Sequence, residues 1–195
     1  MAVITTVFMN KELIGIIRNE DYNLYSSPFV ITNKNSIINI ATRAYNKFKE
    51  VYKTSESTWT YDKYNIFTIM AGEPYSYIIF QQLVAAIRDR VGDDRPLWLQ
   101  SWLNYHKEDE VLDWHWHDES YIAHGYLSIE PKNTVTEFEK FTIENKVGNL
   151  YVGRTGPGYD HIVRVREPYE GIRITLAFDV KDSCTPTNNL SFIPI

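Results

Sequence analysis

Four of the five histidines in the sequence lie between residues 106 and 124, and the fifth is His161. His115 and His117 are two residues apart, so on an extended segment both side chains leave the same face. This is the geometry that two imidazoles need to meet one ion about 2 Å from each nitrogen. His161 opens a candidate strand just after the turn Gly156-Pro157-Gly158 and could supply a third ligand. The spacing predicts a metal site formed by His115, His117 and His161.

The surroundings of the histidine pair favour a functional site over the simpler alternative of hydrogen-bonded or solvated loop residues. The pair lies in Leu112-Asp113-Trp114-His115-Trp116-His117-Asp118-Glu119, where bulky aromatic residues flank it and acids follow it. Histidines with carboxylate neighbours suit iron, and an open coordination sphere permits chemistry with O₂. We therefore expect a non-haem iron centre.

Two helices are predicted in the first half of the chain. The first starts near Asn35 or Ser36, either of which could cap it, and has apolar residues at helical spacing. The second opens at Pro74 and stops at Gly92, residues favoured at the start and just beyond the end of a helix. The apolar positions are Ile37, Ala41, Ala44, Phe48 and Val51 in the first helix, and Phe80, Leu83, Val84, Ile87 and Val91 in the second.

Strands are predicted elsewhere. Met1–Met9 favours a first strand, Trp59–Met70 alternates loosely, and 97–105 alternates as a two-sided strand. Short strands separated by turn signals, with no helix between them, are typical of an antiparallel sandwich or barrel. The two helices would cover one outer face of it. The remaining candidate strands are Ile122–Glu130, Thr134–Phe141, Val147–Gly153, His161–Arg166 and Gly171–Val180.

The last of these strands has two different faces. One face is apolar enough to pack beneath the helices, and the other is small or polar, as expected for the lumen of a ligand-holding barrel. The strand therefore predicts that Arg173 faces a cavity. The apolar set is Ile172, Ile174, Leu176, Phe178 and Val180, and the lumen set is Arg173, Thr175, Ala177 and Asp179.

Length and composition limit the possible classes of protein. A chain of 195 residues suits one domain: 1–96 supporting strands and helices, 97–180 the barrel core, 181–195 a C-terminal tail. The net charge of −5 and the lack of a basic run argue against a nucleic-acid partner. A lone cysteine, Cys184, excludes an intrachain disulfide. Neither a signal peptide nor a membrane span of ~18 apolar residues is recognisable, so we expect a soluble, cytoplasmic protein without a membrane partner.

The stretch from Trp102 to Val180 resembles the core of the 2-oxoglutarate- and Fe(II)-dependent oxygenases, especially their prolyl-hydroxylase-like branch of phage and marine bacterial type. The resemblance implies a double-stranded β-helix, a jelly-roll or cupin-like barrel. It rests on four segments in a fixed order, which is more specific than any one of them. These are Leu103-Asn104-Tyr105-His106, Leu112-Asp113-Trp114-His115-Trp116-His117, His161-Ile162-Val163 and Arg173-Ile174-Thr175-Leu176-Ala177-Phe178.

The resemblance also implies a site for the cosubstrate 2-oxoglutarate. Arg173 matches the arginine that pairs with the distal carboxylate, a task that suits the planar fork of a guanidinium. Thr175 could add a hydroxyl donor. Tyr105 and Tyr126, expected on neighbouring strands, are further candidate contacts, although a tyrosine in a barrel wall is more often part of the core.

The metal ligands depart from the family pattern at one position. His115 matches the first iron ligand and His161 the distal histidine, but His117 stands where the family has a carboxylate. His117 could itself be the third ligand, giving a three-histidine site such as iron-binding cupins have. Alternatively, His117 and Glu119 form a shifted pair, or metal binding has been lost. We favour the first interpretation because Leu112–Trp114 aligns with the family's lead-in to its first ligand.

The substrate is the least predictable part. His124 and Trp116 are candidate substrate contacts, and the simpler alternative for His124 is a hydrogen-bonded residue of the barrel wall. His106 is expected to be an ordinary loop residue. The resemblance implies hydroxylation of a small-molecule or peptidyl substrate with O₂. Two other functions stay open: a cupin-type metal-dependent dioxygenase or isomerase that uses no 2-oxoglutarate, and a non-enzymatic binding or structural barrel.

Overall fold

Two antiparallel sheets form the framework of the protein. The computed structural model describes residues 12–52, 63–110, 112–183 and 191–195. In these residues one sheet has seven strands in the order β1-β2-β7-β4-β9-β3-β10, and the other has three in the order β6-β5-β8. The strands are β1 (Ile14–Arg18), β2 (Tyr22–Ser26), β3 (Trp98–His106), β4 (Ala123–Glu130), β5 (Thr134–Phe138), β6 (Thr142–Glu144), β7 (Asn149–Gly153), β8 (His161–Val165), β9 (Arg173–Lys181) and β10 (Phe192–Pro194).

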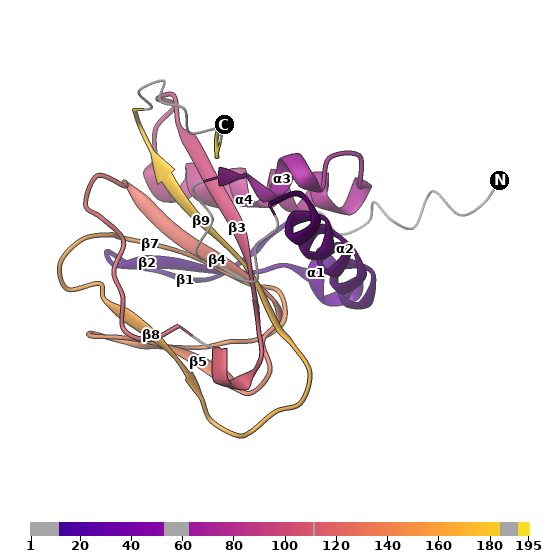
Figure 1. The fold of residues 1–195 in the computed structure, drawn as a ribbon. Helices are drawn as coiled ribbons and strands as arrows, with labels where there is room; N and C mark the ends of the chain where they lie inside the picture. Colours follow the sequence, from indigo (N-terminus) through magenta and orange to yellow (C-terminus); the bar gives the residue numbers. More distant parts are fainter. Residues whose placement is uncertain (1–11, 53–62, 111, 184–190) are drawn as a thin grey trace.

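The helices lie on one side of the large sheet, and the small sheet lies on the other (Figure 1). They are α1 (Pro28–Thr32), α2 (Lys34–Tyr52), α3 (Ile66–Ile69) and α4 (Pro74–Val91), and a 3₁₀ turn lies at Glu108–Glu110. The predicted mainly β fold of antiparallel strands with covering helices is confirmed. In the described residues, no helix is long and apolar enough to cross a membrane.

The two predicted helices are present. Helix α4 begins at Pro74, and Gly92 ends it in the left-handed conformation (φ 78°) that a residue without Cβ adopts at no steric cost. Helix α2 begins at Lys34, before the predicted cap residues Asn35 and Ser36, so that part of the prediction is wrong. Val51, in the last turn of α2, was predicted on the buried face but is 54% exposed.

The segment before α4 was predicted incorrectly. Of Trp59–Met70, predicted as a strand, residues 63–70 are described, and they contain helix α3. The Asn65 side chain accepts a hydrogen bond from the Phe67 amide and caps the helix. Its amide nitrogen donates to the carbonyls of Leu99 and Ser191, so contacts remote in sequence fix this turn. The predicted first strand, Met1–Met9, lies outside the described residues.

The five strands predicted after residue 120 are all present as β4, β5, β7, β8 and β9, with ends that differ by a few residues. Three other strands were not predicted: the pair β1 and β2, and β6, which follows a turn where Thr134–Phe141 was expected to continue. A fourth, β10, lies in the expected C-terminal tail and pairs with β3.

The alternation of β9 separates two environments, as predicted. Ile174, Leu176, Phe178 and Val180 are buried with the helices in the main hydrophobic core. The other face of the large sheet packs against the small sheet through a second, more aromatic cluster, which consists of Tyr22, Leu24, Tyr126, Phe138, Ile143 and Tyr151. The polar residues of β9 lie on this inner face, and this places them between the two sheets.

Gly125 in β4 is a position where the fold depends on a missing side chain. A Cβ atom there would lie 2.1 Å from the carbonyl oxygen of Tyr151 and 2.5 Å from the ring of Phe178. We expect Gly125→Ala to lower the free energy of unfolding by about 2 kcal/mol or more, because backbone must move. Urea denaturation would measure this. The matched control is Gly15→Ala in β1, whose added Cβ meets nothing closer than 3.7 Å; equal losses in both variants would contradict the packing argument.

Candidate metal centre

Three histidines from two distant segments meet at the open side between the sheets. His161 is the first residue of β8, and His115 pairs with it as an isolated antiparallel bridge. The two residues exchange both backbone hydrogen bonds, N–H to O, at 3.0 and 2.9 Å. His117 follows two residues later, and one ring nitrogen from each of the three side chains lies within 4.8 Å of the others. The predicted group of His115, His117 and His161 is therefore brought together, and it could bind a metal ion.

The hydrogen bonds of the three rings leave one nitrogen of each available. The Nδ1 atom of His115 lies 2.7 Å from the carbonyl oxygen of Asp113, and that of His161 lies 3.3 Å from the carbonyl oxygen of Tyr159. The Nδ1 atom of His117 lies 2.5 Å from Oδ1 of Asp179. All three acceptors require Nδ1 to carry the proton, so Nε2 keeps its lone pair. This is the arrangement that metal-binding histidines almost always have.

Burial favours the neutral, metal-binding form of His115 and His161. Desolvation lowers the pKa of His115, and it lowers the pKa of His161 well below its ordinary value. The neighbouring histidines His115 and His117 lower the pKa of His161 further, because a proton on one ring repels a proton on the next. At neutral pH these imidazoles can therefore donate an electron pair without first losing a proton.

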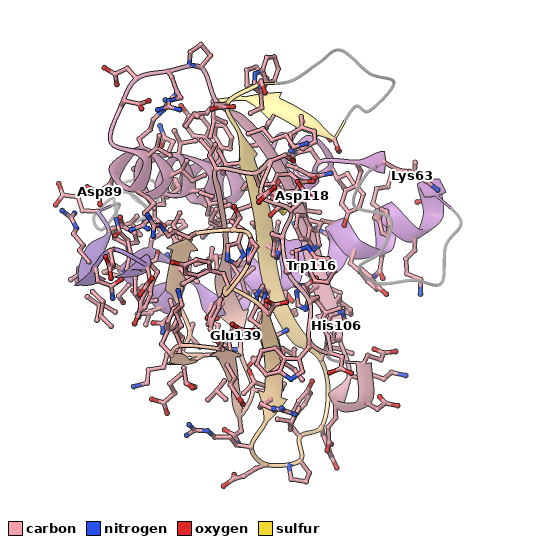
Figure 2. The ribbon with its side chains drawn as sticks, turned by 90° about the vertical axis from the view of Figure 1, so that its left-hand side faces the viewer. Lys63, Asp89, His106, Trp116, Asp118 and Glu139 are labelled. Carbon is pink, nitrogen blue, oxygen red and sulfur yellow. The ribbon has the colours of Figure 1, made fainter. Side chains whose placement is uncertain are left out.

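The rival ligand Glu119 lies at the rim of this site. It is exposed, and it lines a cavity of about 430 Å³ together with Trp116, Asp118, Gly156, Pro157 and Asp160. It does not belong to the group of three convergent ligands found among the described residues. Trp116, a predicted substrate contact, is 67% exposed at the same rim, and Figure 2 shows it beside Asp118 on one face of the molecule. Its position allows contact with a molecule that approaches the histidines.

A buried polar group occupies the inner face of the large sheet. Arg173 is only 2% exposed, and no ion pair among the described residues includes it. Its Nε atom has no hydrogen-bond partner in the described parts of the chain. The same holds for the hydroxyl of Thr175 and for that of Ser128, which lies directly across the sheet from Thr175. Burial lowers the pKa of Arg173 to about 10. Buried unpaired donors of this kind are costly unless a ligand satisfies them.

The tyrosines differ in their relation to Arg173. Tyr126 is buried on the inner face, where its hydroxyl interacts electrostatically with Arg173. Tyr105 lies on the opposite face: it pairs with Ile174 and its ring stacks on Tyr45 of α2 at 4.1 Å. The prediction that Tyr105 contacts the cosubstrate is therefore corrected.

His106 is a residue that the sequence did not single out. It was expected to be an ordinary loop residue, but it is the last residue of β3, is buried, and pairs with Arg173 across the sheet. Burial and the guanidinium of Arg173 lower its pKa to about 4, so it is neutral at pH 7. Its strand register, one residue after Tyr105, was the signal that could have placed it on the inner face.

His124, the other predicted substrate contact, lines the metal site. Its ring is buried and lies 4.3 Å from that of His117 and 5.1 Å from that of His161, between centroids. Its Nε2 atom lies 3.4 Å from the hydroxyl of Tyr151. His124 therefore packs behind the three convergent histidines and limits how far their rings can turn.

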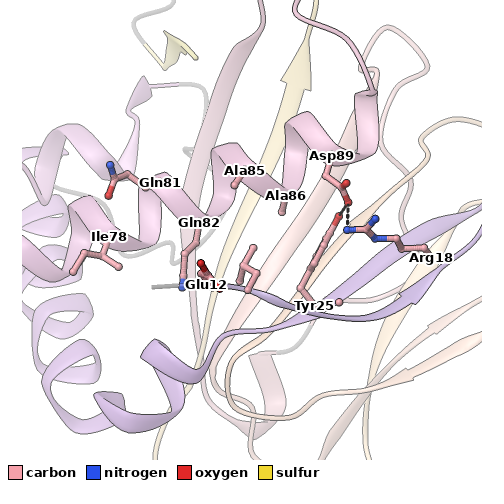
Figure 3. A pocket seen from close by; sticks show the side chains of 11 residues that line it. Glu12, Arg18, Tyr25, Ile78, Gln81, Gln82, Ala85, Ala86 and Asp89 are labelled. Carbon is pink, nitrogen blue, oxygen red and sulfur yellow. Dashed lines mark hydrogen bonds and ion pairs between the residues drawn. The ribbon is translucent and has the colours of Figure 1, made fainter. Parts of the chain in front are cut away.

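A cavity of about 410 Å³ lies elsewhere, between α4 and the first two strands (Figure 3). Two of its charged groups pair with each other: Asp89 lies 3.1 Å from Arg18, and it also accepts a hydrogen bond from the Tyr25 hydroxyl. None of the three convergent histidines lines it. Its geometry does not suggest chemistry comparable to that of the histidine cluster.

Comparison with protein-family models and with curated protein sequences finds no significant match for this chain. The arrangement of its own residues therefore carries the functional argument.

Proposed function

We propose that this protein is a 2-oxoglutarate- and Fe(II)-dependent oxygenase with a three-histidine iron site. The observation that carries the proposal is the pairing of two features between the same sheets. One is a group of three histidines with Nε2 atoms available, and the other is a buried Arg173 that has no carboxylate partner among the described residues. A metal ion would bind the available nitrogens of the histidines, and an anion would pair with the guanidinium of Arg173.

The strand order supports the finer assignment of the fold as a double-stranded β-helix. Four adjacent strands of the large sheet run β7-β4-β9-β3, and the small sheet adds β6-β5-β8. The bridge between His115 and His161 extends the small sheet by one more position beside β8. Apart from the hairpin of β5 and β6, consecutive strands from β4 to β9 alternate between the two sheets. Two facing sets of four strands are typical of a jelly roll.

In this proposal each group has a defined task. His115, His117 and His161 would hold Fe(II), and Arg173 with Thr175 would bind the distal carboxylate of 2-oxoglutarate by charge-assisted hydrogen bonds. Iron and 2-oxoglutarate would together supply hydroxylation of a substrate C–H bond by O₂, with release of succinate and CO₂. The aromatic residues between the sheets exclude water from this region, and the exposed Trp116 would meet the small-molecule or peptidyl substrate at the rim.

An anaerobic titration tests the proposal. We expect 2-oxoglutarate added to the Fe(II) protein to produce a visible charge-transfer band, because its keto and carboxylate oxygens would bind the metal together. Admission of O₂ should then convert 2-oxoglutarate to succinate in the stoichiometry of the metal-loaded protein. A protein that binds Fe(II) and gives neither the band nor succinate would contradict the proposal.

A cupin-type dioxygenase or isomerase that uses no 2-oxoglutarate is the second candidate. The observation that favours it is the ligand set, since the described cluster contains three histidines and no carboxylate. Intact Fe(II) binding without a 2-oxoglutarate band would support this candidate. A purified protein with no affinity for transition metals would instead point to a non-enzymatic barrel.

A further inference from the structure

Asp179 is a carboxylate buried beside the histidine cluster. It lies on the inner face of β9, opposite Gln100 of β3 and His124 of β4. Its side chain is 4% exposed, and its only ion-pair partner among the described residues is His117. A buried carboxylate without a cationic partner is unfavourable by several kcal/mol in general, so its position beside a candidate cation site needs a physical reason.

The contact between Asp179 and His117 is short and direct. Oδ1 of Asp179 accepts a hydrogen bond from Nδ1 of His117 at 2.5 Å. This bond restricts the tautomer of His117 and the rotation of its ring, and it leaves Nε2 as the ring nitrogen that a metal could use. His117 lies on a segment without strand or helix structure between the His115 bridge and a turn at residues 119–120. The backbone of His117 is held by the Gly156 amide, which donates to its carbonyl oxygen at 3.0 Å. Asp179 adds support for the His117 ring from strand β9.

The other two histidines are held differently. His115 and His161 use their Nδ1 atoms on main-chain carbonyl oxygens, which are neutral acceptors. Only His117 is held by a carboxylate. A carboxylate acceptor makes an imidazole a stronger electron-pair donor. It also places one negative charge a single ring away from a cation bound by three neutral ligands.

We infer that Asp179 is a positioning residue that orients His117 and supplies the metal site with the negative charge that its three-histidine ligand set lacks. The inference rests on the metal site of the proposed function but not on its use of 2-oxoglutarate. It also gives β9 two tasks, because Arg173 at the start of the same inner face would anchor the cosubstrate. A small shift of β9 would then move both Arg173, which would bind the cosubstrate, and Asp179, which holds the metal ligand His117.

Asp179→Asn separates charge from shape. The asparagine oxygen can still accept the hydrogen bond from His117, but the negative charge is gone. We expect the affinity for Co(II), measured by competition with a chromophoric chelator, to fall about 10- to 100-fold, and the visible absorption spectrum of bound Co(II) to change. The matched control is Asp160→Asn, which removes a carboxylate that acts on His115 electrostatically without a hydrogen bond to a ligand ring in the described residues. Its affinity should change less than about threefold.

A double-mutant cycle distinguishes positioning from a general effect on folding. In a His117→Ala background the Asp179→Asn change should weaken Co(II) binding clearly less than it does in the wild type, because only the negative charge is then lost and the orientation of His117 no longer contributes. A loss of similar size in both backgrounds would overturn the inference, as would unchanged affinity in the single variant. Thermal unfolding of the metal-free variants shows whether the fold is retained.

The outcomes separate this inference from the proposed function. Tight Co(II) binding by the wild type and weak binding by Asp179→Asn, without turnover of 2-oxoglutarate, would leave the role of Asp179 standing and remove the oxygenase. Equal affinity for Co(II) in the wild type and both single variants, together with turnover of 2-oxoglutarate, would support the oxygenase and overturn the role of Asp179. Absence of Co(II) binding by the wild type would overturn both.

Discussion

His161→Gln is expected to abolish tight metal binding while it leaves the fold in place. His161 joins the two parts of the site, because its backbone bridges His115 and its ring lies 4.2 Å from that of His115 and 5.3 Å from that of His117, between centroids. Structural zinc sites gain about 10–16 kcal/mol from four ligands. One ligand is thus worth about 3 kcal/mol, and its loss should weaken Co(II) binding on the order of a hundredfold or more.

The glutamine side chain keeps much of the volume and polarity of the imidazole, and the backbone bridge to His115 does not depend on the side chain. The temperature of unfolding of the metal-free variant should therefore change little. His106→Gln is the matched control, since His106 is an equally buried histidine that lies beside Arg173 and outside the cluster. Competition titration would measure both. If His106→Gln weakened Co(II) binding as much as His161→Gln did, the ligand assignment would be wrong.

The faces of β9 could be read from the sequence because its two faces differ in chemistry. Apolar residues alternate with Arg173, Thr175 and Asp179, so period-two patterning alone placed the arginine between the sheets. The same reasoning did not separate the faces of β3. Nearly every residue of that strand is buried, on one side by helices and on the other by the inner layer. With aromatic and apolar residues on both faces, the pattern did not exclude Tyr105 as a cosubstrate contact, although Tyr105 lies on the side of helix α2.

The three histidines of the cluster could be predicted from the sequence, but the contact of Asp179 with His117 could not. The spacing of His115 and His117 indicated a shared direction, and His161 opened a recognisable strand. Asp179 was identifiable as an inner-face carboxylate, yet the sequence contained no sign that it would contact His117. That contact joins residues 62 positions apart through the pairing of β9 between β3 and β4. Only the three-dimensional register, which depends on long-range strand pairing, determines it.

The Arg173→Met substitution is expected to have the other large effect, on 2-oxoglutarate rather than on metal. Burial lowers the pKa of Arg173 from 12.5 to about 10, which corresponds to roughly 3 kcal/mol against burying the charge. Removal of an unpaired buried charge in favour of an apolar side chain of similar length is often neutral or stabilising. The variant without ligand should therefore be at least as stable as the wild type, as measured by thermal unfolding.

The binding of 2-oxoglutarate to the Arg173→Met protein should weaken on the order of a hundredfold or more, since loss of one partner of a buried charged pair costs about 2–5 kcal/mol. Co(II) affinity should be unchanged, because Arg173 is not one of the convergent ligands. The control is Arg164→Met, on an exposed arginine of β8 that pairs with Glu137 at 3.2 Å. Anaerobic titration of the Fe(II) proteins, followed by the charge-transfer band, would measure both.

A second ligand makes this prediction specific to the distal carboxylate. 2-Oxobutyrate keeps the keto acid group but lacks the carboxylate that Arg173 would bind. The wild type should strongly prefer 2-oxoglutarate, and Arg173→Met should bind the two keto acids with similar affinity, because the distal contact is gone. If the variant bound both keto acids more weakly by the same factor, Arg173 would have a structural role on the inner face and would not bind the distal carboxylate. An unchanged preference for 2-oxoglutarate would remove Arg173 from the cosubstrate site altogether.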